Sequence, residues 1–390
     1  MPIILDGNGI IKNINFQHPS ASATNLSLNS DGTIAGAIPY PNRNLLYNGA
    51  MQLSQRGTST ASITTGGYYT ADRWYKDVVS LGTWTQSVEN DAPTGSGFRK
   101  SLKMLCTTAD ASPAAGDYSN IHQRLEGQDL QRIAKGTSSA QQLTMSFWVK
   151  SNVTGTYICE LFDSDNTRSV SASYTISASA TWEKKTITFP ADTTGAFDND
   201  NAASLYVLWW LGAGTTFTSG TLATTWASAT TANRAVGQTN LGAATNNYWQ
   251  ITGVQLETGS IATPFEFKNY GQELRECQRY YIRQTRTSSS TTDVTGAFAP
   301  ASSWTSAWQA YLVFPVTMRS VPILGSSATS TFCIHTGGVA TSTISSIGAS
   351  QATVDGARLG GASNYASTSG FGGQLCAYNA TAFLEFSAEL

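Results

Sequence analysis

The chain has 390 residues, of which 12% are charged, and its formal net charge is −2. This length suffices for two or three domains of ordinary size. Lys and Arg are too sparse to form the basic stripe that neutralises phosphates, which argues against nucleic-acid binding. Aromatic residues make up 11% of the chain, which argues against disorder.

Residues 1–43 are predicted to form an arm. The segments 3–14 and 29–38 each place a Gly-containing turn between apolar residues, a pattern typical of short hairpins. The apolar run at the start ends at Asp6, so this segment is not typical of a signal peptide. The arm has too little apolar surface to fold alone. We therefore expect it to be ordered by a partner or by sister chains.

Residues 44–262 are predicted to form a large β-sandwich. Strand-like runs separated by polar turns recur throughout this region, as all-β sandwiches require. The runs are 82–89, 100–108, 119–126, 142–150, 155–163, 169–177, 182–189, 204–212 and 248–257. In the fourth run Leu143, Met145, Phe147 and Val149 share one face. The run 204–212 is apolar on both faces and is predicted to be buried on both sides. Residues 126–136 are predicted to form a short helix that ends at Gly136.

Residues 263–287 carry a charged stretch that is predicted to form a connecting helix of about four turns. Leu274, Cys277 and Tyr281 lie at positions i, i+3 and i+7 and form a narrow apolar stripe. Because such a helix is marginal alone in water, the stripe must pack on something. One possibility is its own sandwich. The other, which we prefer at this stage, is that three copies meet at a common axis through these three residues, making the protein a homotrimer.

Residues 288–390 are predicted to form a second, smaller β-sandwich. Its strand-like runs are 308–316, 322–327, 330–335, 352–361, 374–379 and 382–390. The predicted fold class is therefore all-β: an N-terminal arm, a large sandwich, a short helix and a smaller C-terminal sandwich.

No catalytic constellation is recognisable, and we expect no enzyme and no cofactor. H-E-x-x-H, G-x-S-x-G and Walker patterns are absent from the sequence, and His122 is expected to be a packed strand residue. The acidic turns 163–166 and 198–201 lack the Gly and Glu of an EF-hand, so Asx turns are expected rather than a metal site. In residues 71–74 we expect Trp74 in the core and an Arg–Asp pair at the rim.

The five cysteines form no C-x-x-C pair, and free buried thiols in a protein made in a reducing cytoplasm are expected. No segment approaches the ~18 apolar residues of a membrane span.

Several phrases resemble a family of tailed-bacteriophage virion proteins. They are NLLYNGAMQLSQRGTS, YYTADRWY, LTMSFWVKSNVTGTY and WQITGVQLETGSIATPFEFKNYGQELRECQRYY, and the first residues also look like the start of phage fibres. The likeness covers most of residues 44–285. It implies a tail fibre or receptor-binding protein with a jelly-roll domain similar to carbohydrate-binding modules. It also implies a homotrimer that attaches to other virion proteins through residues 1–43 and recognises a surface glycan of the host.

Three functions are compatible with the sequence: a receptor-binding fibre, a structural virion accessory without a ligand, and a polysaccharide-degrading spike. The first is favoured, and the long repeats that spikes usually carry are absent from the sequence. For a host-facing region at 288–390, the expected sugar-binding aromatics are Trp304, Trp308, Tyr365 and Phe371 in Ser/Gly-rich stretches. For Trp308 a place in the core is the alternative.

Overall fold

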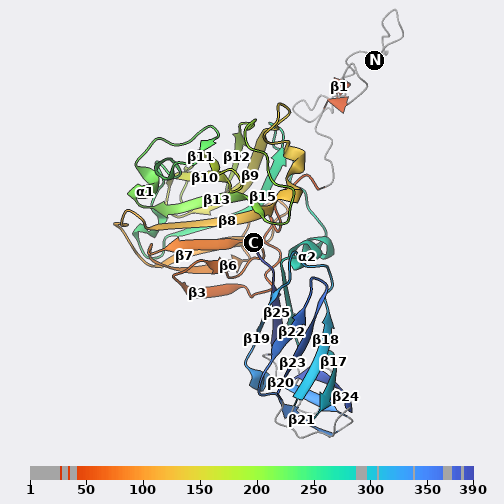
Figure 1. Ribbon diagram of the computed structural model, residues 1–390. Coiled ribbons are helices and arrows are strands. Elements are labelled where there is room, and N and C mark those ends of the chain that lie inside the picture. Colours follow the sequence, from red (N-terminus) through yellow and green to blue (C-terminus); the bar gives the residue numbers. More distant parts are fainter. Residues whose placement is uncertain are drawn as a thin grey trace, which may run out of the picture.

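The computed structural model describes residues 27–28, 34–35, 42–286, 297–304, 307–336, 339–362, 371–378 and 382–390. These residues form two β units, one below the other, with helix α2 at the junction (Figure 1). The predicted all-β fold is confirmed. In the arm, β1 (Ser27–Leu28) pairs antiparallel with β2 (Ile34–Ala35), as predicted for the second hairpin. The first predicted hairpin lies outside the described residues.

The larger unit is a sandwich of two antiparallel sheets. The seven-stranded sheet has the order β14-β11-β10-β13-β8-β5-β4. Its strands are β4 (Gly67–Tyr68), β5 (Tyr75–Val79), β8 (Tyr118–Glu126), β10 (Gly155–Asp163), β11 (Arg168–Ile176), β13 (Ala203–Ala213) and β14 (Ala227–Ser228). The six-stranded sheet has the order β12-β9-β15-β7-β6-β3. Its strands are β3 (Ser59–Ile63), β6 (Thr83–Glu89), β7 (Ser101–Thr108), β9 (Leu143–Ser151), β12 (Glu183–Phe189) and β15 (Tyr248–Thr258).

Alternating side chains fill the space between these sheets. Met145 and Phe147 of β9 face Trp209 of β13 across the core, and all three are buried. Strand β13 is also buried on its second face, as predicted, because the connection after it covers Trp210. That connection carries α1 (Thr215–Thr218), η3 (Thr231–Asn233) and η4 (Leu241–Ala243). The helix predicted before Gly136 is instead a pair of 3-10 turns, η1 (Gly127–Asp129) and η2 (Gln131–Ile133).

The smaller unit packs a three-stranded sheet against a seven-stranded one. The first has the order β16-β25-β19, with β16 (Tyr281–Thr285), β19 (Ile323–Ser326) and β25 (Phe383–Ser387). The second has the order β21-β20-β24-β17-β18-β23-β22. Its strands are β17 (Ala297–Trp304), β18 (Ala307–Val313), β20 (Phe332–Thr336), β21 (Val339–Thr343), β22 (Gly348–Ala352), β23 (Gly356–Ala362) and β24 (Phe371–Ala377), and η6 (Thr329–Thr331) precedes β20. Since Ile282 of β16 belongs to its core, this unit begins before residue 288.

The helix in the connecting segment is shorter than predicted. Helix α2 (Tyr270–Gln278) has nine residues, and the Asn269 side chain caps its start by accepting from the Gln272 N–H. Cys277 is fully buried within the chain, Tyr281 is 2% exposed and belongs to β16, and Leu274 is half-buried. Cys277 and Tyr281 therefore pack on their own chain, which corrects their predicted place at a three-fold axis, while a contact between copies through Leu274 stays a prediction.

A buried ion pair joins the two units. Arg73, which has no exposed surface, pairs with Glu389 near the end of the chain, and its guanidinium lies 3.4 Å from the centre of the Tyr280 ring. Arg56 also contacts Glu389, at 3.2 Å. The predicted rim pair between Arg73 and Asp72 is wrong, because Asp72 instead accepts hydrogen bonds from Gln55. Trp74 lies in the core as predicted.

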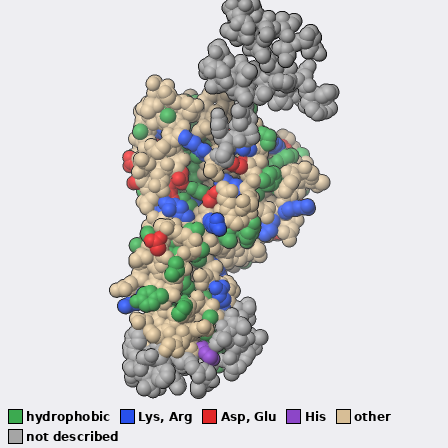
Figure 2. Space-filling model, turned by 90° about the vertical axis from the view of Figure 1, so that its right-hand side faces the viewer, with side chains coloured by type: hydrophobic (Ala, Val, Ile, Leu, Met, Phe, Trp, Pro, Cys, Tyr) green, Lys and Arg blue, Asp and Glu red, His purple; other side chains and the backbone are tan. Residues whose placement is uncertain are grey.

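Charged groups are distributed unevenly over the surface. On the face in Figure 2, Lys, Arg, Asp and Glu side chains gather over the sandwich and its lower margin, while the smaller unit shows mainly hydrophobic and uncharged side chains. The exposed hydrophobic residues of the smaller unit include Tyr311, Val313 and Ile323. No helix in the described part of the chain is both long and apolar enough to cross a membrane.

One lysine points into the sandwich core. The Lys76 ammonium donates to the Ser119 hydroxyl and lies 4.7 Å from the centre of the Trp84 ring. Burial lowers the pKa of Lys76 to about 7, and the nearby Asp77 and Cys106 only partly oppose this effect. The folded protein therefore holds this amine neutral at a pH at which the unfolded chain still binds a proton there.

We predict that Lys76→Met removes a pH dependence of stability. Because the pKa is depressed on folding, the unfolded state binds more protons between about pH 7 and pH 10, so Lys76 makes the wild-type stability rise with pH in that window, by up to ~1.4 kcal/mol per unit. The difference in unfolding free energy between variant and wild type should thus be largest below pH 7 and shrink toward pH 10. Urea denaturation at several pH values measures it. A difference that does not change with pH would contradict the prediction.

We further predict that Glu389→Gln destabilises the protein by about 3–5 kcal/mol, because it leaves the buried charge of Arg73 without its partner. The matched control is Glu183→Gln, which removes the more accessible partner of Lys185 and should cost about 0–1 kcal/mol. Chemical denaturation of both variants provides the comparison. Equal losses would show that the junction pair is no more important than a surface pair.

Candidate functional site

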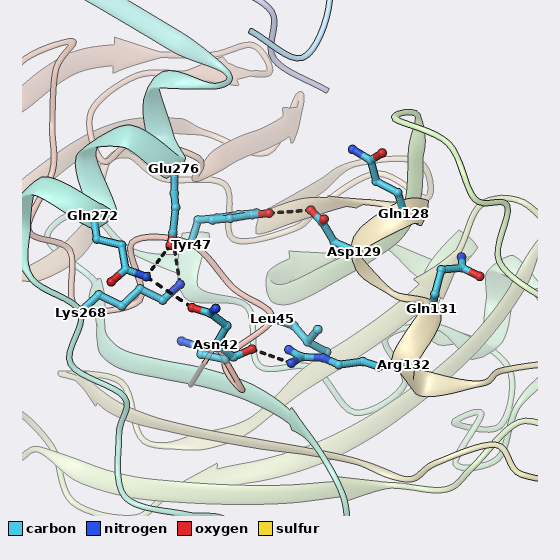
Figure 3. A pocket seen from close by; sticks show the side chains of 11 residues that line it. Asn42, Leu45, Tyr47, Gln128, Asp129, Gln131, Arg132, Lys268, Gln272 and Glu276 are labelled. Carbon is cyan, nitrogen blue, oxygen red and sulfur yellow. Dashed lines mark hydrogen bonds and ion pairs between the residues drawn. The ribbon is translucent and has the colours of Figure 1, made fainter. Parts of the chain in front are cut away.

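A polar pocket of about 450 Å³ lies where the chain enters the sandwich, beside α2 (Figure 3). Its polar side chains are largely engaged with one another. The Tyr47 hydroxyl donates to Asp129 at 2.6 Å, and burial raises the pKa of Tyr47, so this phenol stays a donor. Arg132 donates to the carbonyl oxygens of residues 42 and 43, and Lys268 pairs with Glu276 at 2.7 Å. This arrangement is typical of a structural junction rather than a ligand site.

The outer face of the seven-stranded sheet carries a row of aromatic rings. Its side chains alternate with those that fill the core, so they point away from it. Tyr75 of β5 stacks on His122 of β8 with ring centres 4.8 Å apart. Tyr206 of β13 lies 5.6 Å from His122 and 5.9 Å from Phe162 of β10. Tyr75, Tyr206 and Phe162 are half-exposed, so the row offers ring surface across four adjacent strands.

Arginine 124 organises one end of this row. Its guanidinium lies 4.5 Å from the centre of the Tyr75 ring and 5.0 Å from that of Tyr206. Its Nε donates to His122 Nε2 at 3.1 Å, so that nitrogen must be an acceptor. His122 Nδ1 then carries the proton and donates to Asn120 Oδ1 at 2.9 Å. Burial lowers the pKa of His122 far below its usual value, and the expected packed, neutral histidine is found.

A buried carboxylate organises the other end. Glu160 of β10 accepts from Arg234 Nε at 2.7 Å and from Trp210 Nε1 at 2.9 Å. Burial raises its pKa, which Arg234 opposes. The Arg234 guanidinium also lies 4.9 Å from the centre of the Phe162 ring. Tyr206, between the two arginines, has a hydroxyl group without a hydrogen-bond partner among the described residues. This hydroxyl is free to bind a ligand.

The aromatics predicted from the sequence are not brought together as a site. Trp308 is 1% exposed in the core of the smaller unit, so its ring is not available to a sugar, which corrects that prediction in favour of its alternative. Trp304 and Phe371 lie at strand ends, but their side chains are outside the described part, as is all of Tyr365. The prediction for these three residues stays a prediction.

The acidic turns behave as Asx turns. Asp163 Oδ1 accepts from the Asn166 N–H and Asp200 Oδ1 from the Ala202 N–H. The other Asp163 oxygen accepts from the buried Lys135 ammonium at 2.5 Å, which also contacts Asp192 and the carbonyl oxygen of residue 195. A side-chain cation thus already neutralises Asp163 and Asp192. Among the described residues, no group of three or more His, Cys, Asp or Glu is arranged to hold a metal.

The prediction of free, buried thiols is confirmed. All five are free and buried. Cys333 and Cys376 lie directly opposite each other on β20 and β24, a proximity that depends on strand register and had no signal in the sequence.

No protein-family model matches the chain, and no curated protein matches it. Among solved structures, it is similar to the enzymatically active domain of tailspike protein 4 of bacteriophage CBA120, with 15% identity and a TM-score of 0.31 over 57% of this chain and 22% of that one. It is also similar to the module TmCBM61 in complex with β-1,4-galactotriose (9% identity, TM-score 0.29, 55% of this chain and 99% of that one). A third is the C-terminal family 22 carbohydrate-binding module of Clostridium thermocellum Xyn10B (12% identity, TM-score 0.29, 58% and 100%). At such values the likeness assigns no residue a role.

Proposed function

We propose that this chain is a bacteriophage virion protein that binds a glycan on the surface of the host cell through the outer face of its seven-stranded sheet. The observation that carries the proposal is the half-exposed ring of Tyr206, with its free hydroxyl, between Phe162 and the pair formed by Arg124 and Tyr75. The assignment to a virion rests on the resemblance of residues 44–285 to phage fibre proteins.

The chemistry of this face suits a sugar. Sugar rings present C–H surfaces that pack on aromatic faces, while their hydroxyl groups seek hydrogen bonds around the ring. Tyr206 and Phe162 supply the faces, and the Tyr206 hydroxyl and the Arg124 guanidinium supply polar partners. Both arginines already contact protein acceptors, Glu160 for Arg234 and the carbonyl oxygen of residue 390 for Arg124. Because Arg234 is paired with the Glu160 carboxylate, we infer an uncharged glycan at the Phe162 end of this face.

We propose that this face binds a glycan and does not cleave it. Glycoside hydrolysis uses two carboxyl groups, about 5–10 Å apart, that flank the bond to be cleaved. On this face Glu160 has no exposed surface and is held by Arg234 and Trp210, and Asp77 accepts from the Tyr118 hydroxyl. Glu160 is therefore not presented to a sugar on the aromatic row, and the partly exposed Asp77 alone does not make the pair of carboxyl groups.

The remaining parts take supporting roles in this proposal. In this proposal, residues 1–43 attach the protein to other virion proteins. A homotrimer would raise the avidity of a weak glycan site. Its contacts would have to involve surfaces other than Cys277 and Tyr281, which are buried within one chain.

We predict that Tyr206→Ala weakens glycan binding at least tenfold, because it removes both the ring face and the free hydroxyl. The measurement is binding of labelled protein to an array of bacterial surface polysaccharides. Tyr311→Ala is the matched control, since Tyr311 is an exposed tyrosine on the smaller unit. Binding that survives Tyr206→Ala but is lost in Tyr311→Ala would place the receptor site on the smaller unit.

We also predict that deletion of residues 1–41 leaves the sandwich folded, because the core and the junction lie outside that segment. The truncated protein should bind the same array as the wild type but no longer join virions. Incorporation into particles, followed by immunoblotting of purified phage, tests this. Normal incorporation of the truncated protein would refute the attachment role.

A further inference from the structure

A hollow lies on the outer face of the six-stranded sheet, on the side of the sandwich opposite the aromatic row. Its volume is about 410 Å³, and its walls include Phe98, Trp148 and Phe267. Trp148 points out of β9, on the face opposite Phe147, and is half-exposed. Phe267 is 57% exposed and lies 5.1 Å from Phe98, ring centre to ring centre. The hollow therefore offers aromatic surface on more than one side.

The floor of this hollow is built to bring the backbone close to the aromatic wall. Gly253 sits in an irregularity of β15 between Thr252 and Gln255, with φ at +61°. A Cβ atom at this position would lie 2.5 Å from the Phe98 ring. A side chain here would be strained by the backbone conformation and would displace the Phe98 ring, so glycine is favoured.

Three polar groups around Trp148 lack partners among the described residues. Lys184 of β12 and Thr252 of β15 are its direct cross-strand neighbours, one on each side. The Lys184 ammonium is exposed and makes no ion pair or hydrogen bond there. The Ser146 hydroxyl lines the hollow, in a residue only 4% exposed, and has no hydrogen bond. The Thr252 hydroxyl is buried and likewise unbonded.

Two lysines of this face, Lys184 and Lys103, have no carboxylate partner among the described residues. Asp91 is already engaged by Lys150, by Trp182 and by Gln250. Lys103 lies 5.0 Å from the centre of the Tyr248 ring and forms no ion pair in the described part of the chain. An anion that reaches Lys184 thus meets no competing carboxylate on the hollow. This is the reverse of the seven-stranded face, where Arg234 is paired with Glu160.

We propose that this hollow is a second glycan site and that it takes a sugar residue bearing a carboxylate. The ring of the sugar packs on Trp148 and Phe267, the carboxylate pairs with Lys184, and a hydroxyl group bonds to Ser146. An ammonium without a partner selects an anion, and the aromatic walls select a ring with C–H faces. The inference shares with the proposed function only the class of ligand, and it rests on different residues.

The test uses tetrasaccharides of galacturonate, glucuronate-containing hyaluronan and mannuronate, each beside its carboxyl-reduced form. Calorimetric titration of the full chain should show binding of at least one acidic tetrasaccharide and weaker binding of its reduced form. Lys184→Gln should lower the affinity for the acidic tetrasaccharide about three- to tenfold and remove the salt dependence of that affinity. Trp148→Ala should lower the same affinity more than tenfold.

Lys185→Gln is the matched control, because Lys185 is the next residue on the same strand and faces the other way. It should bind like the wild type. Tyr206→Ala should also bind the acidic tetrasaccharide with the affinity of the wild type. This result would show that the hollow is a different site from the aromatic row. The proposal is overturned if none of the three acidic ligands binds the wild type. It is equally overturned if Lys184→Gln binds them as tightly as Lys185→Gln does.

Discussion

The buried ion pair between Arg73 and Glu389 is the contact on which the arrangement of the whole molecule depends. Two desolvated charges cannot be separated without a cost of several kcal/mol, so the end of the chain is tied to the start of the sandwich. Tyr280, which follows α2, covers the guanidinium and is fixed by the same contact. Arg73 has a φ of +73°, an uncommon conformation for a residue with a side chain, which the surrounding contacts must hold in place. Buried contacts of one charged cluster therefore join the two β units.

Each broad face of the sandwich keeps a partly exposed aromatic area, around Tyr206 on the seven-stranded sheet and around Trp148 on the six-stranded sheet. They have the same architecture but different chemistry. On the seven-stranded sheet, Arg234 pairs with the Glu160 carboxylate, while Arg124 donates to His122 and to the carbonyl oxygen of residue 390. On the six-stranded sheet, Lys184 stands beside Trp148 without a partner among the described residues. In the two sites that we propose, the pairing of the cations rather than the number of aromatics therefore distinguishes the classes of sugar.

Alternation along single strands made much of the fold predictable. Each of the nine runs proposed in the sandwich is a strand, because one buried and one outward face leave a period of two in the sequence. The outward position of Trp148 follows from the same rule. Its neighbours Lys184 and Thr252 do not, since they come from other strands and their positions depend on register. The pairing of Arg73 with Glu389 could not be predicted either, because no local pattern links residues so far apart in the chain.

Strands that are apolar on both faces show the limit of this reasoning most clearly. Residues 204–212 and 307–313 have similar patterns, yet their outcomes differ. In β13 the second face is buried because the connection with α1 and η3 folds over Trp210. In β18 nothing in the described part of the chain covers the second face, so Tyr311 and Val313 are exposed while Trp308 takes the inner side. A pattern with two apolar faces predicts that a strand is present. Which of the two faces is buried depends on the volume available between the two sheets. That volume is set by residues elsewhere in the chain, and this is why Trp308, for which both a sugar-binding role and a place in the core were compatible with the sequence, belongs to the core.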